Sequence, residues 1–210
     1  MIVAIDGLAA SGKGTLAKAL ALELGFAHLD SGLIYRAVGW KVLQDGGDDL
    51  ESAAIMAAIT LRSEDLANPD LRTEIVARMA SKVAAIPAVR KAVLDFQRNF
   101  ARTPPGGAKG AVLDGRDIGT VVCPDAEVKI FVTATPEERA RRRFEELKPT
   151  HPDLTLDAVT ADIAERDRRD TEREVAPAVP APDAHLLDTT NLAIDSVVAK
   201  AKALVSGARL

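Results

Sequence analysis

A glycine-rich segment near the start of the chain constrains the fold more than any other feature, and it reads Gly7-Leu8-Ala9-Ala10-Ser11-Gly12-Lys13-Gly14-Thr15. An apolar run at residues 2–5 precedes it, and apolar residues at helical spacing follow it from Leu16. A strand, a glycine loop and a helix in this order are typical of a phosphate-binding P-loop, here with the pattern G-x-x-x-x-G-K-G-T.

The residue types of this loop suit nucleotide binding. Gly7 and Gly12 let the backbone turn tightly and point N–H groups at an anion, next to the positive end of the following helix. Lys13 supplies a mobile cation for the outer phosphates, and Thr15 supplies a hydroxyl for Mg²⁺. The alternative interpretation is a tight glycine-rich turn that carries a surface lysine.

Short apolar runs alternate with helical patterns along the rest of the chain. Strands are predicted at residues 2–5, 27–30, 111–114, 128–132 and 185–187. This alternation indicates an α/β fold with a five-stranded parallel sheet and helices on both faces. Because residues 45–107 contain several helical patterns and no strong strand, we expect them to form a helical insertion. The predicted division is a single domain with core 1–44, 108–142 and 175–210, insertion 45–107 and lid 143–174.

Three helix ends carry explicit sequence signals. Asp45-Gly46-Gly47 is expected to end the helix that opens at Ser31-Gly32. Asn68-Pro69 predicts the start of a helix with Leu71, Ile75, Met79 and Val83 on one face. Thr135-Pro136-Glu137-Glu138 predicts a capping box with proline at the first helical position.

Charge and composition narrow the partners. The net charge of −4 offers no electrostatic footprint for a nucleic-acid polymer. No apolar run is long enough to span a membrane. The single cysteine, Cys123, cannot form an internal disulfide, and Gly7 lies too early for a cleaved signal peptide to precede the loop. We therefore expect a cytoplasmic protein, and a monomer, whose partners are small molecules.

Polar residues follow the predicted strands at one edge of the sheet, where ligands bind in such folds. Asp114 ends a buried strand predicted to lie beside the P-loop strand, and it is expected to hold Mg²⁺ through a water molecule. The alternative is a turn aspartate without a ligand. Arginines are dense on two helices around a proline-broken loop, which favours a mobile lid over the alternative, a solvated ion-pair surface. These side chains are Arg139, Arg141, Arg142, Arg143, Arg166 and Arg173.

Four motifs together resemble the bacterial cytidylate kinases, a family of P-loop nucleoside-monophosphate kinases. Besides the P-loop, they are Asp30-Ser31-Gly32-x-x-Tyr35-Arg36, Asp114-Gly115-Arg116-Asp117-Ile118-Gly119-Thr120 and Glu165-Arg166-Asp167-x-x-Asp170-x-x-x-Glu174-Val175-Ala176-Pro177. They stand in family order, and the resemblance covers nearly the whole chain. It implies phosphorylation of CMP and dCMP by ATP with Mg²⁺, by in-line transfer between an NMP-binding insertion and a lid.

The resemblance also implies roles for individual residues. Catalytic roles fall to Lys13, Arg116 and Arg166. ATP binding falls to Gly7, Leu8, Ala9, Ala10, Ser11, Gly12, Lys13, Gly14 and Thr15, with Arg139, Arg142 and Arg143 from the lid. CMP binding falls to Ser31, Tyr35, Arg36, Ser81, Arg90, Arg116, Asp117, Asp170 and Arg173, of which Asp117 would read the cytosine amino group. The metal side chains are Thr15 and, through water, Asp114.

One departure from the family pattern concerns the insertion, where residues 60–68 are too few for the β-hairpin that many members carry. Two rival functions stay open from the residues alone. One is another small P-loop kinase that acts on a different monophosphate or on the hydroxyl of a small metabolite. The other is a non-enzymatic regulator that binds ATP.

Overall fold

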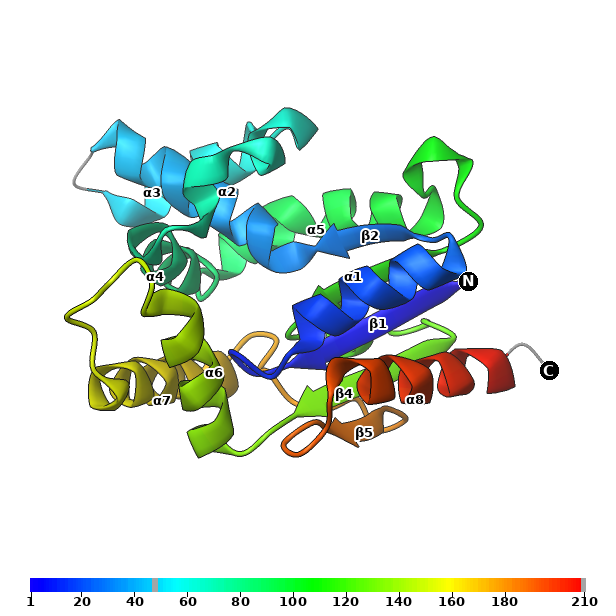
Figure 1. Cartoon of the computed structure of the whole chain (residues 1–210). Coiled ribbons are helices and arrows are strands. Elements are labelled where there is room, and N and C mark those ends of the chain that lie inside the picture. Colours follow the sequence, from blue (N-terminus) through cyan, green and yellow to red (C-terminus); the bar gives the residue numbers. More distant parts are fainter. Residues whose placement is uncertain (47–48, 209–210) are drawn as a thin grey trace.

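The sheet organises the fold, which we describe from a computed structural model covering residues 1–46 and 49–208. Its five strands are parallel and lie in the order β2-β3-β1-β4-β5. Their bounds are β1 Ile2–Gly7, β2 Ala27–Asp30, β3 Ala111–Gly115, β4 Val128–Thr133 and β5 His185–Asp188. The predicted five-stranded parallel sheet is confirmed, including the place of β3 beside β1 (Figure 1).

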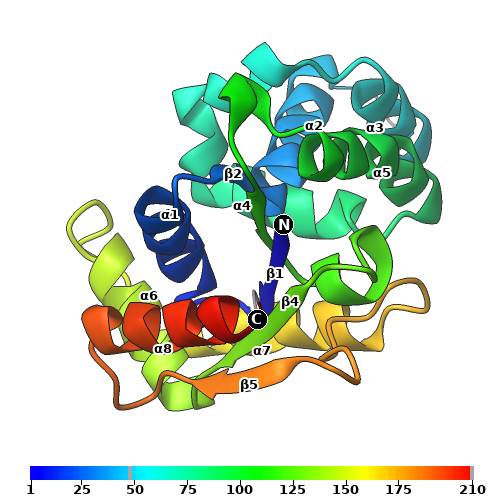
Figure 2. The same ribbon diagram turned by 90° about the vertical axis from the view of Figure 1, so that its right-hand side faces the viewer.

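Helices cover both faces of the sheet, as predicted, and the described ones are α1 Lys13–Leu24, α2 Ser31–Asp45, α3 Leu50–Ile59, α4 Glu74–Val83, α5 Pro87–Arg102, α6 Pro136–Leu147, α7 Leu156–Glu172 and α8 Ile194–Gly207. Figure 2 shows α1 and α8 on one side of the strands and α2 and α5 on the other. Leu16 and Val198 pack against Val3 and Val112 on the first side. Because a strand alternates its side chains, Ala4 and Leu113 face the opposite cluster.

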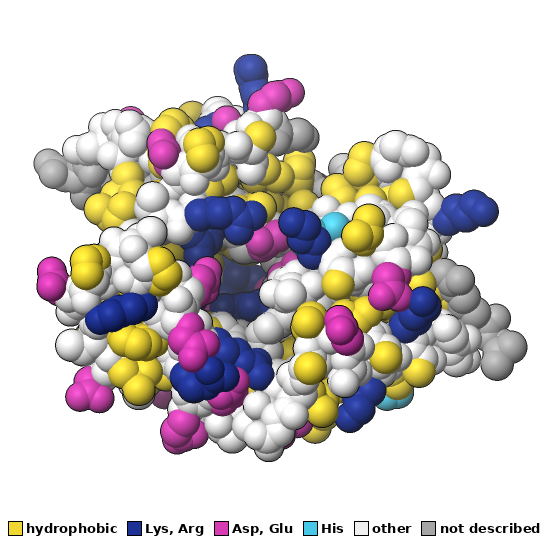
Figure 3. All heavy atoms as spheres, viewed as in Figure 1, with side chains coloured by type: hydrophobic (Ala, Val, Ile, Leu, Met, Phe, Trp, Pro, Cys, Tyr) yellow, Lys and Arg dark blue, Asp and Glu magenta, His cyan; other side chains and the backbone are white. Residues whose placement is uncertain are grey.

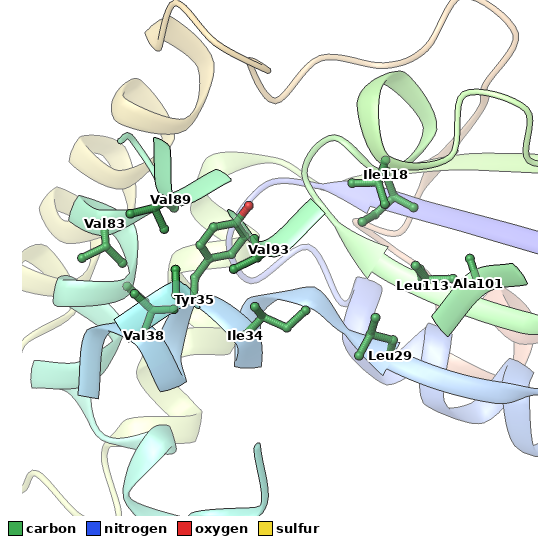
Figure 4. Packing of buried hydrophobic residues seen from close by; sticks show 14 of the residues in the cluster. Leu29, Ile34, Tyr35, Val38, Val83, Val89, Val93, Ala101, Leu113 and Ile118 are labelled. Carbon is green, nitrogen blue, oxygen red and sulfur yellow. The ribbon is translucent and has the colours of Figure 1, made fainter. Parts of the chain in front are cut away.

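The larger apolar cluster joins the sheet to the insertion. Tyr35 and Val38 of α2 lie against Val83, Val89 and Val93 from α4 and α5 (Figure 4). Among its described residues the insertion contains no strand, and single-turn 3₁₀ helices stand where a hairpin would be, at Ser63–Ala67 and Pro69–Arg72. The insertion therefore packs onto the core through helices.

The predicted helix from Asn68-Pro69 to residue 83 is wrong in its first third. Asn68 caps the 3₁₀ turn, and Thr73 is extended (φ −71°, ψ 154°), so α4 begins only at Glu74. Ile75, expected on the buried face, is 64% exposed. The break accompanies burial of Leu71 in a small cluster with Val76 and Ala37.

The other two predicted helix ends fare better. Gly46 ends α2 in the left-handed conformation (φ 64°), whereas Gly47 lies outside the described residues. Thr135 caps α6, and its hydroxyl accepts the N–H of Glu138 at 3.4 Å. The reciprocal half of the capping box is absent among the described contacts. The Glu138 carboxylate is engaged by Arg141 and Arg142 instead, and the N–H of Thr135 donates to Thr190.

The arginine-bearing helices α6 and α7 form a separate small unit beside the open end of the sheet (Figure 1). Ala140 of α6 packs on Val159 and Ile163 of α7 in an apolar cluster distinct from the two that cover the sheet. Within residues 1–46 and 49–208, no helix combines the length and apolar character that crossing a membrane requires.

Candidate active site

A cavity of about 530 Å³ opens at the carboxyl ends of the strands, between the P-loop, α2, α4 and the pair α6 and α7. Lys and Arg side chains gather around and inside this hollow (Figure 3). The cavity brings together most predicted site residues from distant parts of the chain, namely Ala9, Ala10, Lys13, Gly14, Ser31, Tyr35, Arg36, Ser81, Arg90, Asp114, Arg116, Asp117, Arg143, Arg166, Asp170 and Arg173.

The P-loop closes one end of the cavity. Gly7 lies at φ 156°, and a side chain there would collide with the carbonyl oxygen of Val132 on β4. Gly12 adopts φ 89° immediately before α1, a conformation that favours glycine. The loop therefore wraps the start of α1 with its backbone, and Lys13 stands at the first helical position.

Lys13 is held in an unusual electrostatic state. Burial, reinforced by the charge of Arg116, lowers the pKa of Lys13 from its ordinary 10.5 to about 7, although Asp114 acts in the opposite direction. Its ammonium group lies 3.4 Å from the carbonyl oxygen of Leu8. A phosphate in the loop would restore the stability of the charged form, because an anion nearby favours a cation.

Two carboxylates line the cavity beside Lys13, at the ends of β2 and β3. Asp30 and Asp114 are partners in the strand register. Burial, and then the charge of Asp114, raise the pKa of Asp30. Asp114 is buried, and its Oδ2 lies 2.8 Å from Nε2 of His28. A Cβ atom at position 14 would lie 3.7 Å from Asp114 Oδ1. This oxygen therefore faces Gly14, at the start of α1.

These groups fit Mg²⁺ by their chemistry. Mg²⁺ prefers oxygen ligands, keeps several waters and takes only one or two protein groups beside substrate phosphates. Thr15 is an exposed residue of α1 that carries a hydroxyl, and Asp114 directs a carboxylate oxygen toward the neighbouring Gly14. Among the residues described, no cluster of three or more His, Cys, Asp or Glu side chains could hold a metal ion alone.

Arginines surround the middle of the cavity. Arg116 Nε donates to Asp170 at 2.8 Å, and Arg166 Nε lies 4.0 Å from the same carboxylate oxygen. Burial alone would raise the pKa of Asp170, but Arg116 and Arg166 outweigh it and hold that pKa below its usual range. Burial, and then Arg116, lower the pKa of Arg166 to about 10, so the group stays charged at neutral pH.

Two residues predicted to bind the CMP phosphate already have protein partners. Ser31 Oγ donates to the backbone oxygen of Asp114 at 2.7 Å. Arg36 donates to the backbone oxygen of Leu71 at 2.7 Å. Both line the cavity, and their partners fix the side chains relative to β3 and the insertion.

The far end of the cavity carries an unusual set of polar groups. Asp117 forms a buried ion pair with Arg90, and its Oδ1 lies 3.6 Å from Arg173. Arg90 stands 5.4 Å from the centre of the Tyr35 ring. The buried Ser81 hydroxyl has no hydrogen-bond partner among the described residues. A ligand with its own hydrogen-bond donors and acceptors could pair with these polar groups, whereas an apolar ligand could not.

The three predicted lid arginines divide into two kinds. Arg139 is buried and donates to the backbone oxygen of Ala9 at 3.2 Å and to Asp167 at 2.5 Å. Arg142 donates to the backbone oxygen of Thr189 at 2.6 Å and lies 3.5 Å from that of Ser11. These two brace the back of the P-loop and do not line the cavity, whereas Arg143 does line it. Their ATP contacts stay a prediction.

Sequence reasoning missed three residues that shape the site. Asp6 ends β1 and accepts the N–H groups of Ile118 and Gly119, both at 2.8 Å. Glu74 of α4 pairs with Arg143 of α6 across the cavity. His28 is the third, through its contact with Asp114. The rule that polar residues gather at strand ends could have found Asp6, because it directly precedes Gly7.

Comparison with known proteins adds independent findings. A family model described as Cytidylate kinase matches residues 3–206. A cytidylate kinase of Paramagnetospirillum magneticum is 58% identical over 209 residues and covers 99% of each chain, and one of Azorhizobium caulinodans is 56% identical over 209 residues and covers 100% of each. A solved structure of an uncharacterized protein from Eubacterium ventriosum has a TM-score of 0.55 at 13% identity, covering 100% of this chain and 98% of that one. The last likeness speaks for the fold alone.

Proposed function

The chain belongs to the cytidylate kinase family, and from that premise we propose that it transfers the γ-phosphoryl group of ATP to CMP and dCMP. The products are ADP and CDP or dCDP. The observation that carries this proposal is one continuous cavity with the P-loop and Lys13 at one end and the Asp117, Arg90 and Ser81 group at the other. A kinase for a nucleoside monophosphate needs a donor site and an acceptor site joined in this way.

The donor is held by the P-loop. Backbone N–H groups between Gly7 and Gly12 and the start of α1 receive the triphosphate, and Lys13 contacts its outer phosphates. Thr15 and, through water, Asp114 would hold Mg²⁺, which neutralises charge on the β- and γ-phosphates when bound. Arg139 and Arg142 fix the loop's backbone from behind, which supports a donor site that is organised before ATP arrives.

The acceptor phosphate lies among Arg36, Arg116 and Arg166, whose planar guanidinium groups match phosphate oxygens. Arg143 lines the same region. In-line transfer places the attacking oxygen of CMP opposite the leaving oxygen of ADP, so the work of these residues is positioning and charge stabilisation. No covalent intermediate on the chain is needed. Asp170 accepts from Arg116 and is proposed to accept a hydrogen bond from a ribose hydroxyl as well.

The cytosine base is proposed to stack near Tyr35 and to meet Ser81, Arg90, Asp117 and Arg173. The Asp117 carboxylate accepts a hydrogen bond from the exocyclic amine of cytosine. Uracil presents a carbonyl oxygen there, and two acceptors without a donor repel each other. Arg90 and Arg173 hold this buried carboxylate in place, which supports its role in base reading.

Closure of the site is proposed to involve residues 45–107 as the NMP-binding insertion and residues 143–174 as the lid, around a core formed by the rest. All groups named above come from one chain, which supports a monomer as the working unit. Cys123 is buried and unpaired, in keeping with a reducing cytoplasmic location.

The experiment that tests this function is a coupled assay of ADP release with ATP and Mg²⁺, run across CMP, dCMP, UMP, AMP, GMP and a small metabolite alcohol. We expect CMP and dCMP to give the highest kcat/KM. Preference for another acceptor would assign the chain to a different small kinase. ATP binding without acceptor-dependent ADP release would indicate a regulator and overturn the proposal.

A further inference from the structure

We propose that His28 is a positioning residue for the Asp114 carboxylate, which it orients toward the metal-binding end of the P-loop. This inference rests on the proposed function, because it concerns the Mg²⁺ that accompanies the donor nucleotide. His28 belongs to none of the four motifs that carry the family resemblance.

The strand geometry brings the two side chains together. His28 pairs in register with Val112, and Asp114 lies two residues beyond Val112 on β3. Because side chains alternate along a strand, His28, Val112 and Asp114 share the face that Val112 packs against α1. His28 Nε2 then lies 2.8 Å from Asp114 Oδ2. The imidazole therefore approaches the carboxylate diagonally across the pleat, from the outermost strand.

The contact with His28 places the two carboxylate oxygens of Asp114 in different surroundings. Oδ2 accepts from the ring, whereas Oδ1 faces Gly14 on the first turn of α1, one residue before Thr15. Without the histidine, the carboxylate of an aspartate has a broad torsional range about its terminal bond. Asp30 stands beside it as a second carboxylate, so a free Asp114 would also turn away from like charge. A fixed Oδ1 is ready to accept from a metal-bound water.

The magnitude follows from other sites in which a second residue orients a metal-binding group. Loss of such a partner lowers metal affinity or activity about 10–100-fold. Because Asp114 would act through water, we expect an effect near the lower limit, about tenfold. The alternative is that the pair only braces the edge strand β2 against β3, which would change stability and leave metal dependence unchanged.

The decisive experiment measures ADP binding by calorimetry, once with saturating Mg²⁺ and once with EDTA, so that no acceptor nucleotide is involved. The ratio of the two dissociation constants measures how much Mg²⁺ increases the affinity for ADP, which we call the Mg²⁺-dependent gain. His28→Leu should lower this gain about tenfold with little change of the EDTA value. His28→Gln should restore it, because the amide nitrogen of glutamine can stand where Nε2 stood. His185→Leu, on the opposite edge strand β5, is the matched control and should leave the ratio unchanged.

The same variants can also overturn the proposal. If His28→Leu keeps the wild-type ratio while its melting temperature falls, His28 is a structural brace and the proposal is wrong. If His28→Leu does not fold by circular dichroism, His28→Asn takes its place, because asparagine keeps a donor but is too short to replace Nε2. Equal ratios for the asparagine and glutamine variants would likewise overturn it. A failure of CMP phosphorylation would appear in the coupled assay and not in these ratios.

Discussion

Arg90 of α5 and Asp117, two residues after β3, form an ion pair in which each side chain is less than a tenth exposed. The oxygens of a carboxylate accept hydrogen bonds, and the guanidinium groups of Arg90 and Arg173 hold this carboxylate in place. This pair lies at the end of the cavity remote from Lys13. It therefore fixes an acceptor where the proposed base binds.

Asp117→Asn is expected to narrow the preference for CMP over UMP. The amide can rotate and offer its NH₂ group to the carbonyl of uracil, which the carboxylate cannot do. Loss of one charge-assisted bond corresponds to about 1–3 kcal/mol in discrimination. Relative kcat/KM values for the two monophosphates measure it. An unchanged ratio would remove Asp117 from base reading, and the ATP dissociation constant serves as the control.

Lys13→Met is expected to lower kcat about 100-fold or more without lowering the melting temperature. The cation is lost from the transition state, where such a group contributes several kcal/mol. In the folded protein, however, burial disfavours the charged ammonium group, as its lowered pKa indicates. Removing it relieves that desolvation. Steady-state kinetics and thermal unfolding of the same preparation check both halves. Near-normal turnover would contradict the P-loop assignment.

Lys13 also predicts a pH dependence for ATP binding. Its pKa in the free protein is lowered from 10.5 to about 7, so the charged form is lost as pH rises through about 7. Because kcat/KM for ATP reports the free enzyme, it should fall above that pH. Bound phosphate raises the pKa again, so binding at pH 8 should take up a proton. Calorimetry in buffers of different ionisation heat measures the uptake, and Lys13→Arg, which stays charged, should abolish it.

Asp6 predicts a pH dependence of stability with the opposite sign to that of an ordinary salt-bridged aspartate. Burial, opposed by the N–H groups of Gly119 and Ile118, raises its pKa from 3.8 to about 6. Between these values the folded state binds more protons than the unfolded state, so the contribution of Asp6 falls as pH rises from 4 to 6. A shift of this size corresponds to about 3 kcal/mol.

The comparison of wild type with Asp6→Asn isolates this group, because the other carboxylates are common to both proteins. Relative to the variant, the wild type should lose unfolding free energy as pH rises through that window. Urea unfolding at pH 4.5, 5.5 and 6.5 measures the difference. A difference that stays constant or grows with pH would show that Asp6 is not the group that titrates there.

Local patterns predicted much of this molecule. The strands, the P-loop and most helices follow from periodicity over a few residues, and family motifs placed the cavity residues together. The helix before Glu74 was mispredicted because the start signal at Asn68-Pro69 begins only a 3₁₀ turn, in which Leu71 is buried against Ala37 of α2. The capping box failed in part because two arginines compete for Glu138.

Contacts between distant segments could not be predicted in the same way. The contact between His28 and Asp114 spans 86 residues and depends on register between β2 and β3. The separation of Arg143 from Arg139 and Arg142 depends on how α6 is rotated about its axis, which the sequence leaves open. Each of these needs the tertiary arrangement, because no local propensity favours it.

The small apolar cluster of Ala140, Val159 and Ile163 has a consequence for how the molecule opens. Since it is separate from the two clusters on the sheet, movement of α6 and α7 away from the core would break the polar contacts of Arg139 and Arg142 but leave both larger clusters intact. Such a cooperative unit opens at a lower free energy than global unfolding. Native-state hydrogen exchange should therefore show amides of these two helices exchanging as one group, ahead of those in β1 and β3.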